Sequence, residues 1–350
     1  MDVFTQDTLG LLARVFLSLT PVLVFLIALT FLDSFKLVRP DSVVRSILVG
    51  CLVAVASYFL NVVVLRGYSF DPSTFARYIA PAIEETIKFL FLAWLIGSGR
   101  VGFLVDAAVH GFAIGAGFAL IENVYYLQTV HSTTLLLWMV RGFGTAVMHG
   151  GTLIIAGVIT KTLYDRRQKR PVWIFLPGLL VAYIVHSLFN HFVLPPLQST
   201  VVLLLALPVL VFIVFQRSEA ATMNWLGTGI DSDIEIIELI SSGTISSSSI
   251  GRYLESLRDR FIPTVVADML CLLQIQAELS IRAKSLLLLK KHGVVPPPDE
   301  TLKAALDEMA YLEASIGPTG KLALAPILHL GHRELFQIRL LAQGQKSSTV

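Results

Sequence analysis

Residues 9–32 read LGLLARVFLSLTPVLVFLIALTFL, an apolar run whose one charged residue is Arg14. A helix of about 20 apolar residues spans the roughly 30 Å hydrocarbon core of a bilayer, so this run is long enough to cross a membrane. It is longer than the core of a signal peptide, about 7–15 residues, and it follows acids (Asp2 and Asp7) where a signal peptide has a basic start. We therefore expect it to be a retained transmembrane helix.

Similar apolar stretches recur along the first two thirds of the chain. Together with the first, they cover residues 9–32, 43–65, 76–98, 102–127, 133–161, 172–193 and 199–216. The chain is 55% hydrophobic and 15% charged, whereas soluble domains carry about 25% charged residues. The sequence thus predicts an all-α fold, with a polytopic bundle of about seven transmembrane helices over residues 1–217.

Basic residues alternate between successive loops, and this alternation indicates the orientation in the membrane. The loops expected inside contain Lys36, Arg39 and Arg45, then Arg100, then Lys161, Arg166, Arg167, Lys169 and Arg170. The opposite loops contain only Arg66 and Arg77, and the linkers around His131 and Pro195–Pro196 contain none. We therefore expect an extracytoplasmic N-terminus and a cytoplasmic C-terminal region.

Composition changes near residue 218, and residues 218–350 are predicted to form a small, mainly helical cytoplasmic domain. A Ser-rich linker, 241–249, divides it, and helices are expected over about 251–291 and 299–314. The segment 285–291 is interpreted as a packed helix, with contact to the inner leaflet as the alternative. A cytoplasmic partner of this region is an open hypothesis, and the net charge of +2 gives no reason to expect nucleic acid.

The third apolar stretch contains Pro81-Ala-Ile-Glu84-Glu85-Thr-Ile-Lys88, two carboxylates and an ammonium in an otherwise apolar helix. Lys88 follows Glu84 by four residues and Glu85 by three, so it can neighbour either on the helix surface. Such a pairing keeps a carboxylate ionised in a poorly hydrated place, which makes it a candidate general base. The alternative is a buried ion pair that only ties helices together.

The fourth stretch also carries polar and small residues. Gly111 and Gly115 predict close approach of a neighbouring helix backbone. Asp106 and His110, one turn apart near the inner end, are expected to pair with each other. Glu122, followed by Asn123, is expected at the depth of Glu84 and Glu85.

Two later stretches contribute the remaining candidates. Arg141 and His149, two helical turns apart, share a face of the fifth stretch. Arg141 is a counter-ion or a substrate-binding group, and His149 a site residue or a helix–helix hydrogen bonder. In the sixth stretch His186 and Asn190 share a face, and an imidazole with a carboxamide can hold a metal or stabilise an oxyanion. His191 is expected to be interfacial.

These motifs, Glu84-Glu85-x-x-Lys88, Phe118-x-x-x-Glu122-Asn123, Arg141, His149 and His186-x-x-x-Asn190, resemble the PrsW family of intramembrane proteases, which is related to the CAAX-prenyl-protease-like peptidases. The resemblance covers about residues 78–192. It implies a peptidase of the bacterial cytoplasmic membrane that cuts a single-pass membrane protein, such as an anti-sigma factor.

Carried over to this chain, the resemblance makes Glu84 the base that activates water and Glu85 its partner, held by Lys88. His186 and Asn190 would stabilise the oxyanion or bind a metal, and Glu122 would be a ligand or an orienting acid. Asn123, Arg141 and His149 would support the site. Whether a zinc ion takes part stays open; Glu85, Glu122, His149 and His186 are its candidate ligands.

Two other functions fit intramembrane acids and histidines. One is a proton-coupled transporter, although the sequence shows no second copy of the Glu84-Glu85 motif of the kind that repeated transporter halves contain. The other is a non-catalytic membrane sensor that signals through its C-terminal region. The protease is favoured because polar residues on four stretches are expected at one depth.

Overall fold

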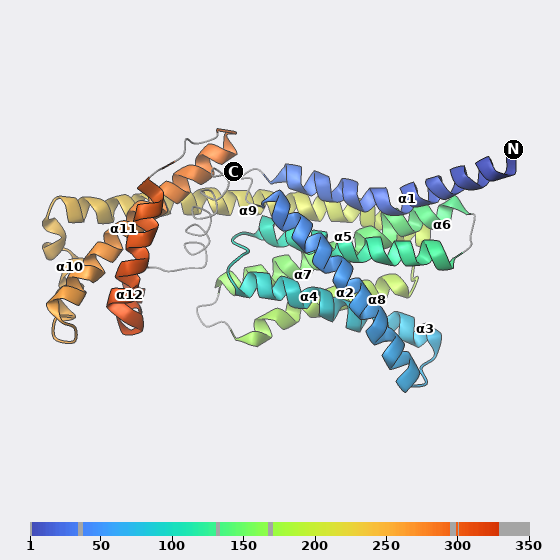
Figure 1. Cartoon of the computed structure of the whole chain (residues 1–350), viewed down its shortest axis with the longest axis horizontal. Coiled ribbons are helices and arrows are strands. Elements are labelled where there is room, and N and C mark those ends of the chain that lie inside the picture. The colour runs from blue at the N-terminus through green and yellow to red at the C-terminus, as the bar shows by residue number, and fades with distance from the viewer. Residues whose placement is uncertain are drawn as a thin grey trace. The chain divides into compact units, whose positions relative to one another are not determined.

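The computed structural model describes residues 2–33, 38–130, 134–166, 171–294, 299 and 301–328, and in these ranges all regular structure is helical (Figure 1). The helices are α1 (Asp2–Leu32), α2 (Pro40–Gly67), α3 (Pro72–Thr74), α4 (Ala80–Gly97), α5 (Leu104–Thr129), α6 (Leu135–Met139), α7 (Ala146–Arg166), α8 (Leu176–Asn190), α9 (Pro196–Ser241), α10 (Ser249–Ser256), α11 (Pro263–Lys291) and α12 (Thr301–Leu328). Two π-helical segments, η1 (Phe75–Ile79) and η2 (Val140–Thr145), run directly into α4 and α7, and two 3₁₀ turns, η3 (Val172–Phe175) and η4 (Thr244–Ser247), precede α8 and α10. The predicted all-α class is confirmed.

The chain separates into two compact units, residues 1–219 and 220–350, and the division falls within α9. The predicted boundary near residue 218 remains a proposal about domains. Of the basic residues used to predict the orientation, Lys36, Arg167, Lys169 and Arg170 lie outside the described residues, as does His131.

Seven helices in the described part of the chain are long and apolar enough to span a membrane, which confirms the predicted class of a membrane helix bundle. Six of them coincide with or overlap predicted stretches. The predicted stretch 76–98 forms η1 and α4. It is not among the seven, because Glu84, Glu85 and Lys88 make it more polar than the other helices. The seventh apolar helix is instead α11, in the C-terminal region.

Helix α11 uses its apolar residues to build the core of the second unit. Met269, Leu272, Leu273 and Leu279 are almost completely buried there, together with residues of α10 and α12. Burial against protein removes apolar surface from water as a bilayer would. The packing therefore supports the proposal that this unit is a helical domain outside the membrane.

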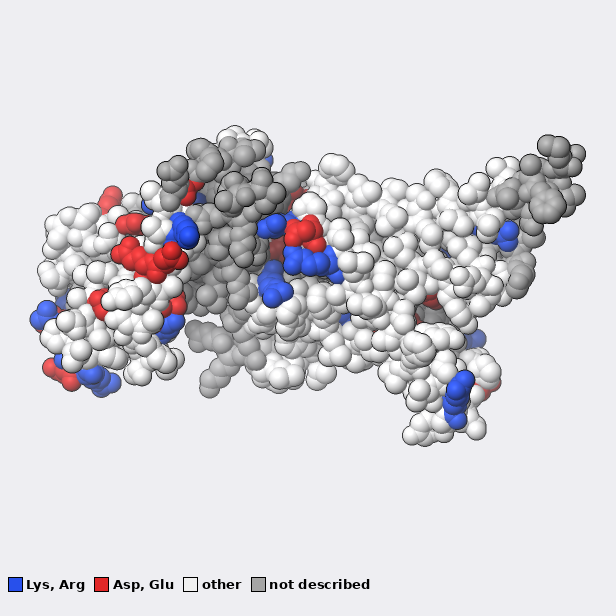
Figure 2. Space-filling model, in the orientation of Figure 1, with Lys and Arg blue, Asp and Glu red and all other residues white. Residues whose placement is uncertain are grey.

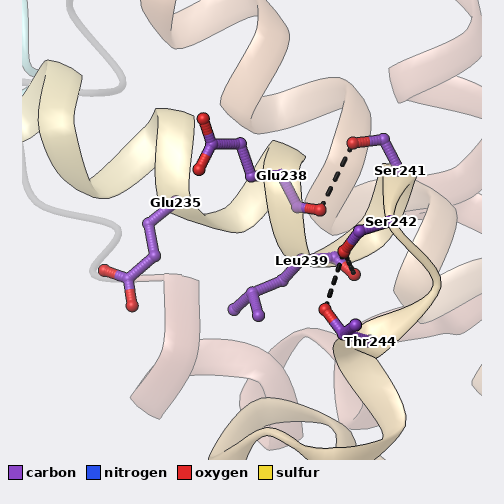
Figure 3. Close-up of a pocket in the computed structure, with 6 residues that line it drawn as sticks. All are labelled: Glu235, Glu238, Leu239, Ser241, Ser242 and Thr244. Atoms are coloured by element: carbon purple, nitrogen blue, oxygen red, sulfur yellow. Dashed lines mark hydrogen bonds between the residues drawn. The ribbon is translucent and has the colours of Figure 1, made fainter.

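The Ser-rich stretch 241–249 forms a turn at the end of α9, the short η4 and the start of α10. The hydroxyl oxygen of Ser248 accepts a hydrogen bond from the Gly251 backbone N–H at 3.0 Å, an N-cap of α10. A pocket at the end of α9 is lined by Glu235, Glu238, Leu239, Ser241, Ser242 and Thr244 (Figure 3). Its hydroxyls bond locally, Ser241 to the Ile237 and Glu238 carbonyls and Ser242 to Thr244, so they are occupied in the structure of the turn.

Helix α5 is the centre of the first unit. Its residues from Val105 to Ala119 are buried, and it packs against α1, α2 and α7. The outward faces of α1, α2 and α9 instead expose Leu, Val and Phe side chains, and on the face seen in Figure 2 the described residues of this unit show few charged side chains. This distribution suits a protein whose outer helices face lipid.

Glycines let the helices around α5 approach at backbone distance. A Cβ atom added at Gly115 would lie 2.3 Å from the carbonyl oxygen of His149, and one at Gly111 2.6 Å from that of Leu153. The predicted packing role of these two glycines is thereby confirmed. Because Gly115 contacts α7 at His149, this packing also positions a candidate site residue.

We predict that Gly115→Ala lowers the free energy of unfolding by about 1–3 kcal/mol, because α7 has to move away from α5 to admit one methyl group. The measurement is thermal unfolding of the detergent-solubilised protein. Gly67→Ala is the control, since nothing lies within 4 Å of a Cβ atom at that position. Equal melting temperatures for the two variants would contradict the close contact.

Candidate active site

Both carboxylate oxygens of Glu85 have partners. Its side chain is fully buried, and one oxygen accepts from Lys88 Nζ at 2.5 Å and lies 2.7 Å from His186 Nδ1. The Thr152 hydroxyl donates to the other oxygen at 3.2 Å. Because a carboxylate only accepts, His186 carries its proton on Nδ1, and its Nε2 is directed away from Glu85. Glu85 therefore joins α4, α7 and α8 and fixes one imidazole.

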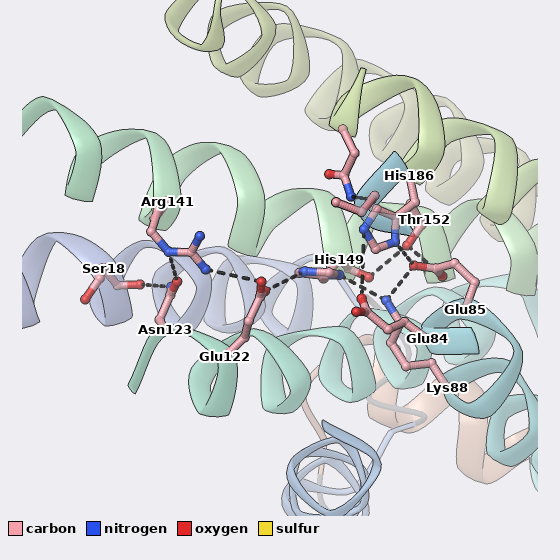
Figure 4. A network of polar contacts seen from close by, with 12 residues as sticks. Ser18, Glu84, Glu85, Lys88, Glu122, Asn123, Arg141, His149, Thr152 and His186 are labelled. Carbon is pink, nitrogen blue, oxygen red and sulfur yellow. Dashed lines mark hydrogen bonds and ion pairs between the residues drawn. The ribbon is translucent and has the colours of Figure 1, made fainter. Parts of the chain in front are cut away.

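Glu122 holds the second imidazole in the same way. Lys88 Nζ lies 3.0 Å from His149 Nδ1, and because an ammonium only donates, Nδ1 accepts. The other nitrogen, His149 Nε2, then carries the proton and donates to Glu122 at 2.8 Å. Lys88 thus contacts both Glu85 and His149, linking the two carboxylate–imidazole pairs (Figure 4).

Arg141 and Asn123 extend these contacts to α1. The Arg141 guanidinium lies 3.3 Å from Glu122 and donates to the Asn123 side-chain oxygen at 3.0 Å. Asn123 donates to the Ser18 carbonyl at 2.7 Å, and the guanidinium stacks 3.6 Å from the Tyr126 ring centroid. Arg141 therefore serves as the counter-ion of Glu122, one of the two roles considered from the sequence.

Glu84 differs from the other two acids. Among the described residues it has no ion pair with a lysine or an arginine; the basic side chain within 4.0 Å is His186, with 3.9 Å between Glu84 Oε2 and His186 Nε2. Its other oxygen accepts from the Asn61 amide at 3.4 Å. The Glu84 side chain is 17% exposed, whereas those of Glu85 and Lys88 are completely buried. Glu122 is also partly exposed, at 25%, but it is paired with Arg141, so Glu84 is the partly exposed acid of the three without a lysine or arginine partner among the described residues.

One carboxylate and two imidazoles are close enough to share a ligand. Ligand atoms of Glu84, His149 and His186 all lie within 4.8 Å of one another. Two histidines with a carboxylate form a donor set found in catalytic zinc sites, and acids that hold the second imidazole nitrogen are the usual outer partners. The candidate ligand set therefore includes Glu84, while Glu85 and Glu122, considered as ligands from the sequence, contact the imidazoles instead.

Several other predicted residues lie apart from this cluster. The Asn190 amide donates to the Ala76 carbonyl at 3.0 Å and so ties α8 to η1. The predicted pairing of Asp106 with His110 is wrong, because Asp106 accepts from the backbone N–H groups of Gly102 and Phe103 and His110 bonds to Ser46. Helix capping engages one oxygen of the aspartate locally, and the histidine contacts α2 instead.

Sequence reasoning missed Asn61 and Thr152. Thr152 follows His149 by three residues, so it lies on the same helical face, a spacing that could have identified it. Asn61 is an amide near the end of the apolar stretch 43–65, and an intramembrane amide needs a partner. The partner, Glu84, comes from another helix and could not be inferred from spacing.

Helices that suit a bilayer, together with an accessible carboxylate beside two oriented imidazoles, define the class as a membrane-embedded peptidase. The family model described as PrsW family intramembrane metalloprotease matches residues 39–216, just over half of the chain, and the protein belongs to this family. The match contains every cluster residue except Ser18. Comparisons with curated proteins and with solved structures gave no match.

The Glu85–Lys88 pair generates a stability prediction. We expect Lys88→Met to lower the free energy of unfolding by about 3–5 kcal/mol, because it leaves a buried carboxylate without its cation. Adding Glu85→Gln should recover much of that loss, since the charge left behind is removed. The measurement is thermal unfolding in detergent.

The control for Lys88→Met is Arg258→Met, which breaks an ion pair of the same i,i+3 spacing, 3.0 Å long, whose side chains are 59% and 66% exposed. It should hardly change the melting temperature, since exposed pairs contribute little. A similar small effect for Lys88→Met would show that the buried pair is dispensable.

Proposed function

We propose that this protein hydrolyses a peptide bond of a membrane-anchored protein, with Glu84 as the base that activates water. The observation that carries the proposal is the difference between three neighbouring acids. Glu85 and Glu122 are each bound to a cation and an imidazole, whereas Glu84 faces His186 and has no lysine or arginine partner among the described residues. A general base needs a partly exposed carboxylate that no cation holds; Glu122 is also partly exposed but is paired with Arg141, so Glu84 is the acid of the three that meets that need.

In the proposed reaction Glu84 accepts a proton from water while the water oxygen adds to the substrate carbonyl carbon. The proton then passes from Glu84 to the leaving nitrogen as the C–N bond breaks. His186 in its protonated form donates to the oxyanion through Nε2, and Glu85 on Nδ1 stabilises that positive charge. The roles of Glu85 and Glu122 are thus to orient the imidazoles.

The membrane setting supports a membrane protein as the substrate. The acids and imidazoles lie on α4, α5, α7 and α8, among helices with lipid-suited surfaces, so the bond to be cut has to reach into the bundle. We propose a single-pass protein, such as an anti-sigma factor in a bacterial membrane, cut near the extracytoplasmic side that the loop charges indicate. The C-terminal region would then lie in the cytoplasm, free to bind a partner.

We predict that cells producing Glu84→Gln accumulate an uncut single-pass membrane protein that cells producing the native chain cleave. Glutamine keeps the shape of the side chain but cannot accept the proton. The measurement is quantitative comparison of the two membrane proteomes, with Glu235→Gln, an exposed position of the second unit, as the control.

Identical proteomes for native and Glu84→Gln cells would reject Glu84 as the base. If solute uptake into proteoliposomes depended on Glu84 instead, the transporter hypothesis would replace the protease.

A divalent metal ion fits the same residues. His186 Nε2, His149 Nδ1 and the Oε2 side of Glu84 would hold it, while Glu85 and Glu122 orient both imidazoles through their other nitrogens. Such an ion would replace the His186 proton at the oxyanion, and Lys88 Nζ would have to release His149 Nδ1. When bound, such an ion supplies a positive charge that polarises the substrate carbonyl. The oxygen Oε1 of Glu84, on the Asn61 side, remains the proton acceptor. The donor set favours zinc.

We predict about one zinc ion per native chain and loss of most of it in His186→Ala, because a three-residue site loses one of its ligands. Elemental analysis of the purified protein measures the metal content directly. His191→Ala is the matched control, since His191 bonds to the Ser187 carbonyl outside the cluster. Equal zinc content in His186→Ala and the native chain would exclude this ligand set.

A further inference from the structure

Asn61 is a polar residue of α2 that has no part in the reaction proposed for Glu84 and His186. Its neighbours in the stretch 58–65 are otherwise apolar, apart from the exposed Tyr58. An amide in such a place costs free energy unless its hydrogen bonds are made. The amide nitrogen of Asn61 donates to Glu84 Oε1 at 3.4 Å, which links α2 to the proposed base on α4.

The other end of the Asn61 side chain is incomplete. Its oxygen, Oδ1, is buried and has no hydrogen-bond partner among the described residues. Because the Glu84 carboxylate only accepts, the NH₂ group has to face it, and the orientation of the amide is fixed with Oδ1 as a second acceptor beside Glu84. A buried acceptor of this kind needs a donor.

A water molecule matches this pair of acceptors. Water has two hydrogens, and with one directed at Glu84 Oε1 and the other at Asn61 Oδ1, a lone pair of its oxygen is left to face a carbonyl carbon. Positioning of this kind lowers the barrier because the reactants no longer have to be oriented in the transition state. The partial exposure of Glu84 provides access for water.

We propose that Asn61 is a further catalytic residue, which orients Glu84 through its NH₂ group and holds the nucleophilic water through Oδ1. This inference rests on the proposed peptidase function. In the step, one O–H bond of water breaks, its proton goes to Glu84, and the new bond joins the water oxygen to the carbonyl carbon. The second hydrogen stays on that oxygen, and Asn61 neither gains nor loses a proton.

Asn61 also takes a task that the sequence had suggested for another amide. Asn190 was the candidate carboxamide of the site, but its NH₂ group is directed at the Ala76 carbonyl. Asn61 is the amide that contacts an acid of the cluster and still has an unused acceptor. The site therefore draws on α2 as well as on α4, α5, α7 and α8.

The test uses the full chain in lipid nanodiscs and a quenched fluorescent peptide that spans the bond cut in the protein accumulating in Glu84→Gln cells. Asn61→Leu should lower kcat about 10- to 100-fold with KM changed less than about 3-fold, because it removes a hydrogen bond to a charged group and a contact to the water. Asn61→Gln should restore part of kcat, since it keeps the amide.

Ser46→Ala is the matched control, because it also removes one side-chain hydrogen bond between α2 and a neighbouring helix, that to His110, away from Glu84. It should leave kcat within about 2-fold of native. If the role of Asn61 were purely structural, Asn61→Leu and Asn61→Gln would both lower the amount of active protein, and glutamine would not restore activity.

The outcomes separate the two proposals. If Glu84→Gln blocks cleavage and Asn61→Leu keeps the native kcat, the role of Asn61 is overturned and the peptidase stands. If Glu84→Gln cleaves like the native chain, the proposed function fails and the role of Asn61 fails with it. If Asn61→Leu does not yield a monodisperse protein, Asn61→Asp is the test variant. It keeps the shape of the side chain but places a second carboxylate against Glu84, so kcat should fall. A native kcat in Asn61→Asp would also overturn the inference.

Discussion

The ion pair between Glu85 and Lys88 is the interaction on which the rest of the site depends. Both side chains are fully buried, where an isolated charge of either sign would be strongly disfavoured. Each partner satisfies the other, and each has contacts left over: Glu85 for His186 and Thr152, Lys88 for His149. One pair on a single helix thereby fixes side chains of two further helices.

This arrangement requires the helices to lie unusually close. Gly111 and Gly115 bring α5 against α7, and Gly50 and Gly117 bring α2 against α5, each at a distance that excludes a Cβ atom. Side chains of the cluster can then meet across helices at 2.7–3.0 Å. Apolar packing between helices gains little in a bilayer, so small residues and polar contacts have to hold such a bundle together.

Much of the fold and part of the site could be predicted from the sequence, and the failures in the fold have one physical cause. Length and hydropathy identify helices but do not distinguish lipid from protein interior. Helix α4 is too polar to be counted as a membrane span, because it carries Glu84, Glu85 and Lys88. Helix α11 is apolar enough to be counted, although its leucines form a protein core.

Within the site, the sequence predicted residue types and helical faces, and these led to Glu84, Glu85, Glu122, His149 and His186. It could not predict partners that come from different helices. The orientation of Asn190 toward Ala76, the contact of Asn61 with Glu84, and the separate partners of Asp106 and His110 all depend on how helices far apart in sequence are packed.

Three glutamates of one chemical type acquire different properties here only through their partners. Glu85 and Glu122 are each held by a cation and an imidazole, so their negative charges serve to position the two imidazoles. Glu84 contacts only the Asn61 amide and, at 3.9 Å, the His186 imidazole among the described residues, so its carboxylate can accept a proton. A site with all three acids paired would be more stable and unable to accept a proton from water. Reactivity at Glu84 thus requires that one acid of the cluster be left without a cation, and the two paired acids keep that arrangement folded.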